Sequence, residues 1–294
     1  MAKSRPADVL FLSSPRTLSN LLVKLLSGQT GWEQSTYCLH DAFEYAQSHL
    51  SECNVESPAE SFGKYLEMLR AGYQDMTTAR EGAHEKGHAF FLKSHVMEMT
   101  NPSRLFAGFR SDVCPFKFTT ELEDSLRPLP GPTRPCYLTR CFYFPSAPDL
   151  WRSNAPSSTS LHFTRALFEW YEAATLLSPS TAGAEVGNLS ISKTHPVVVD
   201  ADDILEGDTV QRLAEMIDMD PEQILQKWDA QSTEGLEGLW ESTGIDMSKS
   251  SRGLDLETKF GSWNELHGVE VGEALAFLTK RQMGDYMWLK SCKI

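Results

Sequence analysis

A hydroxyl-rich loop at residues 13–20 holds the first group of side chains that could do chemistry. It has the sequence Ser-Ser-Pro-Arg-Thr-Leu-Ser-Asn, and Arg16 is its only cation. The apolar run 9–12 before it favours a buried strand, and leucines from Leu21 onward recur at helical spacing. A loop that leads from a strand into a helix presents backbone N–H groups at the helix N-terminus, where anions bind. The stretch therefore predicts an anion-binding turn.

The same loop argues against a nucleoside triphosphate as its ligand. The G-x-x-x-x-G-K-[ST] pattern is missing, and Leu18 stands where a glycine would ease a close approach of the backbone to a phosphate. No acidic magnesium motif is evident either, so the sequence predicts no metal site and disfavours a kinase.

A Lys-Ser-His triplet, residues 93–95, forms the second chemical group. It follows the apolar run 89–92, which we expect to be a core strand. A lysine and a histidine at the end of such a strand would lie at the edge of the sheet where ligands bind. The alternative is that His95 caps the next segment and Lys93 points to solvent. The similar triplet 193–195 precedes its strand and should lie at the opposite edge.

Four segments, taken in order, resemble the sulfotransferase superfamily, a branch of the P-loop fold, and are nearest to fungal sulfotransferase-like proteins. They are the loop 15–20, the triplet 93–95, Arg140 with Ser146, and Val197–Asp200 followed by a helix and Trp228. The resemblance spans roughly residues 8–290. It implies an α/β fold with a three-layer parallel sheet and a P-loop-like strand–loop–helix unit.

The resemblance also implies a cofactor, 3′-phosphoadenosine 5′-phosphosulfate, and roles for particular residues. Arg16 and Lys93 would stabilise negative charge on the leaving phosphate or the sulfate, and His95 would remove the proton of the acceptor hydroxyl. The residues expected to bind the cofactor are Arg16, Thr17, Ser19, Asn20, Arg140 and Ser146.

Several of these residues have a purely structural alternative. Ser19 and Asn20 would serve equally well as helix caps. The six-residue separation of Arg140 and Ser146 is shorter than the usual eight, so the 3′-phosphate pocket that they would form is reshaped or absent. Leu18 adds a branched side chain that could obstruct phosphate binding.

The elements that position these residues are read from periodicity. We expect helices over 57–80, 161–177 and 269–289, a helix around 213–217 with a second beginning at Pro221, and strands over 89–92, 136–139 and 197–199. Residues 81–87 are expected to form a loop. Prolines punctuate residues 101–160, which we interpret as an irregular proline-rich lid inserted into a single α/β domain of residues 1–294.

Composition restricts the partners and the compartment. The chain has 294 residues and carries 27 Lys and Arg against 40 Asp and Glu, a formal charge of −13, which disfavours nucleic acid and anionic membrane. Six cysteines without C-x-x-C spacing indicate free thiols. The sequence has no apolar segment long enough for the core of a signal peptide or for a membrane span. We therefore expect a cytoplasmic protein whose partner is a small molecule.

The sequence thus favours an enzyme that transfers a sulfuryl group from 3′-phosphoadenosine 5′-phosphosulfate to a hydroxyl of a small, apolar secondary metabolite. The alternative keeps the fold without the cofactor, as an isomerase, dehydratase or cyclase of a natural-product pathway centred on His95. A non-catalytic binding protein is the third possibility.

Overall fold

The computed structural model describes residues 6–14, 17–50, 58–99, 133–139, 160–177, 195–205, 207–227, 245 and 255–294. For residues 58–59, 133–139 and 174–177 it describes the backbone alone. The expected lid at 101–160 lies outside these ranges except for residues 133–139 and 160.

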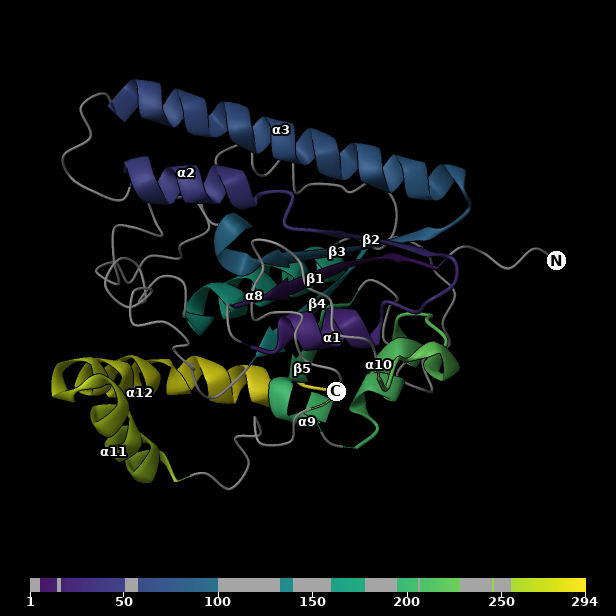
Figure 1. Ribbon diagram of the computed structural model, residues 1–294. Helices are drawn as coiled ribbons and strands as arrows, with labels where there is room; N and C mark the ends of the chain where they lie inside the picture. The colour runs from purple at the N-terminus through teal and green to yellow at the C-terminus, as the bar shows by residue number, and fades with distance from the viewer. Residues whose placement is uncertain are drawn as a thin grey trace.

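A five-stranded parallel sheet forms the centre of the molecule (Figure 1). Its strands are β1 (Asp8–Ser13), β2 (Trp32–Thr36), β3 (Ala89–His95), β4 (Thr133–Thr139) and β5 (Val197–Asp200). Their order across the sheet is β2-β3-β1-β4-β5, and every pairing is parallel. The strand that precedes the predicted anion-binding loop, β1, therefore lies in the middle.

Helices cover both faces of the sheet (Figure 1). They are α1 (Ser19–Leu25), α2 (His40–Leu50), α3 (Pro58–Glu85), α8 (Leu161–Leu177), α9 (Ala201–Leu205), α10 (Thr209–Met216), α11 (Leu256–His267) and α12 (Val269–Ser291). Two short 3₁₀ helices, η1 (Val96–Met99) and η2 (Pro221–Gln223), complete the described elements.

Alternation along β1 divides the core between the two faces. Leu10 and Leu12 pack in a cluster with residues of α2, α3 and α8. Val9 and Phe11 point the other way, into a cluster with α1, α9 and α10. Side chains of a strand alternate between faces, so a strand buried on both faces reads as one apolar run. The expected three-layer α/β architecture is confirmed.

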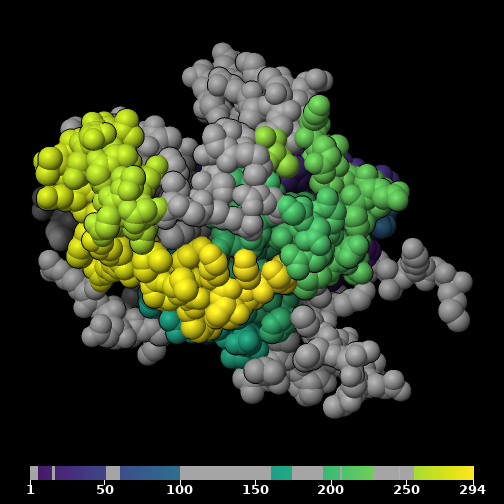
Figure 2. Space-filling model, turned by 90° about the horizontal axis from the view of Figure 1, so that it is seen from below, coloured from purple at the N-terminus to yellow at the C-terminus, as the bar shows by residue number. Residues whose placement is uncertain are grey.

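The C-terminal residues close the far edge of the sheet. Lys293 pairs with Val198 of β5, and its Nζ lies 2.6 Å from an oxygen of Asp203. Figure 2 shows the end of α12 lying against the surface formed by α9 and α10. The chain thus ends beside β5 rather than beside the central strands.

The structure corrects two expectations and adds elements that the sequence analysis did not predict. The loop expected at 81–87 is shorter, because α3 continues to Glu85. Arg80 and His84 both contact the buried carboxylate of Asp8, which holds this last part of the helix against β1. The helix expected from Pro221 is only the three-residue η2. The unpredicted elements include β2, α2 and α11.

Candidate active site

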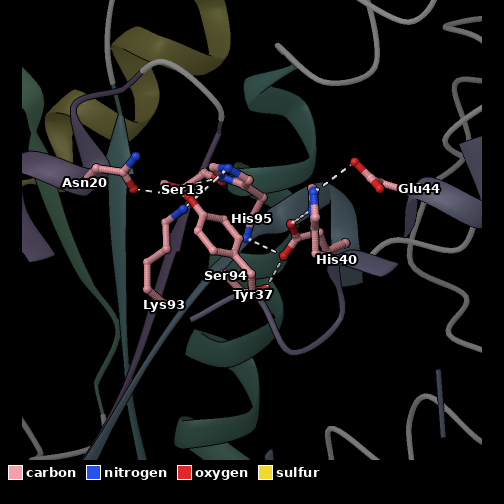
Figure 3. Close-up of polar contacts among 9 residues, drawn as sticks. Ser13, Asn20, Tyr37, His40, Glu44, Lys93, Ser94 and His95 are labelled. Atoms are coloured by element: carbon pink, nitrogen blue, oxygen red, sulfur yellow. Dashed lines mark hydrogen bonds and ion pairs between the residues drawn. The ribbon is translucent and has the colours of Figure 1, made fainter. Parts of the chain in front are cut away.

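The ends of β1 and β3 bring the two predicted chemical groups together. The strands pair so that Ser13 is opposite His95 and Phe11 is opposite Lys93. The loop that follows β1 and the Lys-Ser-His triplet therefore share the carboxyl-terminal edge of the sheet (Figure 3). In open parallel sheets this edge is where ligands bind.

His95 is oriented by Ser13. Its Nδ1 lies 3.2 Å from the main-chain oxygen of Ser13 and 3.1 Å from Ser13 Oγ. A carbonyl oxygen only accepts hydrogen bonds, so the contact assigns the proton to Nδ1. Nε2 then carries a lone pair, and Lys93 Nζ lies 3.5 Å from it as a donor.

Burial changes the ionisation of this pair. Lys93 has no exposed surface. Burial lowers the pKa of Lys93 to about 7, against the opposing attraction of Glu98. Burial, aided by the charge of Lys93, lowers the pKa of His95 to about 4. At neutral pH the imidazole is therefore uncharged, and Lys93 is poised between its two forms.

Tyr37 covers the pair from the end of β2. Its ring centroid is 3.5 Å from Lys93 Nζ and 5.3 Å from the ring of His95. Its main-chain N–H donates to the carbonyl oxygen of Lys93 over 2.9 Å, and its hydroxyl donates to Asn20 Oδ1 over 3.1 Å. Tyr37 thus connects β3 with the first turn of α1 (Figure 3).

The described part of the loop is a turn built without glycine. Leu18 adopts φ 62° and ψ 21°, the left-handed conformation that favours glycine, and stands at the N-cap of α1. Thr17 Oγ1 donates to the carbonyl oxygen of Ser14 over 2.7 Å. Ser19 is the first residue of α1, and no side chain of the described residues caps this helix. The capping alternative for Ser19 and Asn20 is therefore not what is found.

A buried carboxylate lies directly behind His95. Glu98 Oε2 accepts from Ser94 Oγ over 2.5 Å and from the main-chain N–H of His95 over 3.0 Å. Oε1 is 3.1 Å from His40 Nδ1, and His40 Nε2 is 3.1 Å from an oxygen of Glu44. Glu98 thus joins the end of β3 to α2.

Sequence reasoning missed Tyr37, His40 and Glu98. Tyr37 and His40 follow β2, whose residues Trp32–Thr36 contain no apolar run and which lies at the edge of the sheet. For Glu98, the available signal was its position three residues after His95, which lets a carboxylate reach back to a main-chain N–H.

A glycine on α3 sets how closely that helix approaches the segment after β2. A Cβ built at Gly72 would overlap the carbonyl oxygen of Cys38, the residue after Tyr37. Only a residue without a side chain fits there.

The structure does not describe three of the predicted site residues. Arg16, Arg140 and Ser146 lie outside the described residues. His195 precedes β5, as expected, and its ring is nearly perpendicular to that of Phe168, with 6.4 Å between the ring centroids. Within the described ranges, no group of histidine, cysteine, aspartate or glutamate side chains could hold a metal ion. No described helix is long and apolar enough to cross a membrane.

Comparisons with known proteins bear on the family. No protein-family model matches the chain. Over its whole length it is similar to a protein named sulfotransferase ppzF from Metarhizium majus, 25% identical over 346 aligned positions that span 99% of this chain and 97% of the relative. The protein of that name from Metarhizium rileyi is also 25% identical, with the same coverage of both chains.

Among solved structures, the chain is similar to the sulfotransferase domain of an olefin synthase from Synechococcus PCC 7002. The identity is 13%, the TM-score is 0.43, and the match covers 94% of this chain and 97% of that domain. A likeness this remote carries no argument about individual residues. The full-length similarity to the two fungal proteins supports a fungal sulfotransferase-like protein, and the parallel sheet fits the α/β fold expected of one.

Proposed function

We propose that the protein transfers a sulfuryl group from 3′-phosphoadenosine 5′-phosphosulfate to a hydroxyl of a small, apolar secondary metabolite. The name shared by its two fungal relatives supports the reaction class. The formal charge of −13 supports a small-molecule acceptor rather than nucleic acid or an anionic membrane.

One observation carries this proposal: Lys93 Nζ lies 3.5 Å from His95 Nε2 at the carboxyl-terminal edge of the sheet, where the predicted anion-binding loop begins. Sulfuryl transfer needs a base for the acceptor hydroxyl and a cation for the negative charge that develops on the leaving phosphate. His95 and Lys93 supply these two groups side by side.

The described residues also fit an anionic cofactor. The first turn of α1 contains no acidic side chain. In Figure 3 the nitrogen of the Asn20 amide lies on the side away from Tyr37, because Oδ1 accepts from the tyrosine. Bound 3′-phosphoadenosine 5′-phosphosulfate would supply the sulfuryl group and would be held by Arg16, Thr17, Ser19, Asn20 and Lys93, with Arg140 and Ser146 at the 3′-phosphate.

The mechanism assigns a proton position to each residue of the pair. His95, fixed by Ser13 through Nδ1, accepts the proton of the acceptor hydroxyl at Nε2. Lys93, as an ammonium, turns from Nε2 toward the negative charge on the donor side. When the ammonium group of Lys93 moves away from the imidazole and an anion lies nearby, the pKa of His95 rises. His95 is therefore a stronger base when the site is filled.

Calorimetric titration with 3′-phosphoadenosine 5′-phosphate tests the cofactor assignment. We expect micromolar binding by the parent protein and a loss of at least tenfold in Arg16→Ala and in Lys93→Met, each of which removes a cation. Lys64→Ala is the matched control, since Lys64 is 53% exposed on α3 and pairs only with nearby Glu67 in the described contacts. This control should bind as the parent does.

Failure of the folded parent protein to bind would overturn the phosphosulfate-dependent reaction. The pair of Lys93 and His95 would then serve the cofactor-independent alternative, an isomerase, dehydratase or cyclase. In that case His95→Ala would abolish turnover of the substrate, while Arg16 would act in binding it.

A further inference from the structure

We propose that Glu98 is the positioning residue of this site: it fixes the end of β3 that carries His95 and supplies a negative charge that favours the ammonium form of Lys93. The catalytic meaning of this arrangement rests on the proposed function. The arrangement itself can be tested without any substrate.

The hydrogen bonds of Glu98 show why it can fix His95. One carboxylate oxygen accepts from both Ser94 Oγ and the main-chain N–H of His95. The other oxygen accepts from His40 on α2. The side chain of Glu98 is fully buried, so each of these bonds is made away from bulk solvent. Three donors from two elements leave the carboxylate a single position, and the backbone of His95 is tied to it.

The charge of Glu98 is the second part of the argument. Burial alone would raise the pKa of Glu98, but the hydrogen bonds from His40, Ser94 and the His95 N–H outweigh burial and lower it. Glu98 is therefore ionised at neutral pH. Its attraction opposes the effect of burial on Lys93, whose pKa would otherwise fall further.

The charged and titratable groups around Glu98 come from three directions. On β3 they are Lys93 and His95, and at the end of β2 Tyr37 lies over both. On α2, His40 bridges Glu98 to Glu44, whose side chain is 64% exposed. Glu98 is thus the buried carboxylate of the described network, and Glu44 is the exposed one.

A simple capping role makes a different prediction from the role proposed here. The cap requires only acceptor oxygens for Ser94 and the His95 N–H, and Glu98→Gln retains one such oxygen without the charge. If Glu98 only caps η1, the glutamine variant should leave Lys93 unchanged. If Glu98 is the counter-charge, the pKa of Lys93 must fall.

The test is an NMR titration of the Lys93 Nζ–Cε resonances and of the His95 ring nitrogens in the full chain. In Glu98→Gln we expect the pKa of Lys93 to fall by about one unit, in line with the loss of a nearby opposite charge. We expect His95 to keep its tautomer protonated at Nδ1, because the glutamine oxygen still accepts from the main-chain N–H of His95 and Ser13 is unchanged. Glu44→Gln, which removes an equal charge at the exposed end, should leave the pKa of Lys93 within about a few tenths of a unit of the parent.

Equal Lys93 titrations in the parent and in Glu98→Gln would overturn the proposal, as would an equal shift in both variants. Should Glu98→Gln fold poorly, Ser94→Ala together with His40→Gln weakens two of the hydrogen bonds that keep Glu98 ionised, so the pKa of Lys93 should fall in that variant too. Titration with 3′-phosphoadenosine 5′-phosphate is scored separately. Absence of binding by the parent would end the sulfotransferase proposal and leave the Lys93 result standing.

Discussion

The ring of Tyr37 lies over the ammonium of Lys93, with 3.5 Å between Nζ and the ring centroid. Lys93 comes from β3, the neighbour of the edge strand, and is completely buried, whereas Tyr37 directly follows the edge strand β2. A desolvated contact of this kind is worth about 2 kcal/mol. The aromatic ring therefore keeps a buried cation in place at the edge of the sheet.

Substitutions at Tyr37 should separate the ring from the hydroxyl. Tyr37→Phe keeps the ring and loses the hydroxyl's hydrogen bond to Asn20, and we expect its affinity for 3′-phosphoadenosine 5′-phosphate to stay within about threefold of the parent. Tyr37→Leu removes the ring over Lys93. The loss of about 1–2 kcal/mol of cation–π interaction, which orients the lysine, should weaken binding about tenfold. Equal affinities of the two variants in calorimetry would contradict this role of the ring.

Leu18 permits a direct test of backbone strain in the loop. Leu18→Gly and Leu18→Ala both remove the part of the side chain beyond Cβ, which packs against the core cluster formed with α1, α9 and α10. They differ in that glycine adopts a φ of 62° without strain, so the glycine variant should be the more stable by about 1 kcal/mol. Urea unfolding measures the difference, and a more stable alanine variant would argue against the left-handed turn. Leu18→Gly should also bind the nucleotide at least as well as the parent.

The ion pair of Asp8 and Arg80 at the opposite end of β1 should dominate the stability of this region. The two side chains are 1% and 4% exposed, and Arg80 Nε donates to Asp8 Oδ2 over 2.6 Å. Arg80→Met leaves a buried carboxylate without its main cation, and we expect a loss of about 3–5 kcal/mol in the free energy of unfolding. Lys64→Ala, which breaks an exposed pair, should cost less than about 1 kcal/mol.

The same carboxylate predicts a dependence of stability on acid. Burial tends to raise the pKa of Asp8, but hydrogen bonds from His84, Arg80 and the Phe90 N–H outweigh it and hold the pKa below the ordinary 3.8. A lowered pKa contributes stability above the ordinary value and loses it as pH falls through the folded-state value. Asp8→Asn should therefore be less stable than the parent at neutral pH, and the gap should narrow below about pH 3.8. A gap that does not change with pH would contradict this.

The contribution of His40 to stability should depend on pH in the opposite direction to that of Asp8. Its hydrogen bond to Glu98 raises the pKa of His40 above the ordinary 6.5. Stabilisation from a raised pKa is complete below the ordinary value and is lost as pH rises through the folded-state value. The advantage of the parent over His40→Gln in urea unfolding should therefore shrink between neutral and alkaline pH. A constant advantage would show that the pair does not titrate.

The sequence predicted the central part of the fold because buried strands and amphipathic helices leave strong apolar patterns. The run 9–12 and the run 89–92 both became core strands, and the leucines after Ser19 became α1. The edge strand β2 has no such pattern, because its residues are only partly buried. Helix α2, which follows β2 in the chain, was missed as well, and so was Tyr37 between these two elements.

The site could be predicted only as far as its residues lie close in sequence or follow recognisable strands. Lys93 and His95 were found because they end a core strand, although their closeness to Ser13 depends on the register of β1 and β3. The hydrogen bond between His40 and Glu98 joins residues 58 positions apart, and no local pattern specifies such a pair. Glu98 itself stands three residues after His95, a local signal that the sequence analysis did not use.

The close fit of Gly72 against Cys38 makes a distant helix responsible for the shape of the site. The main chain that passes Gly72 is the segment that carries Tyr37, so a methyl group on α3 would displace the backbone that holds the aromatic ring. Gly72 contributes no atom to the described site. A library of variants confined to the residues around His95 would therefore omit a position that affects the contact between Lys93 and the ring of Tyr37.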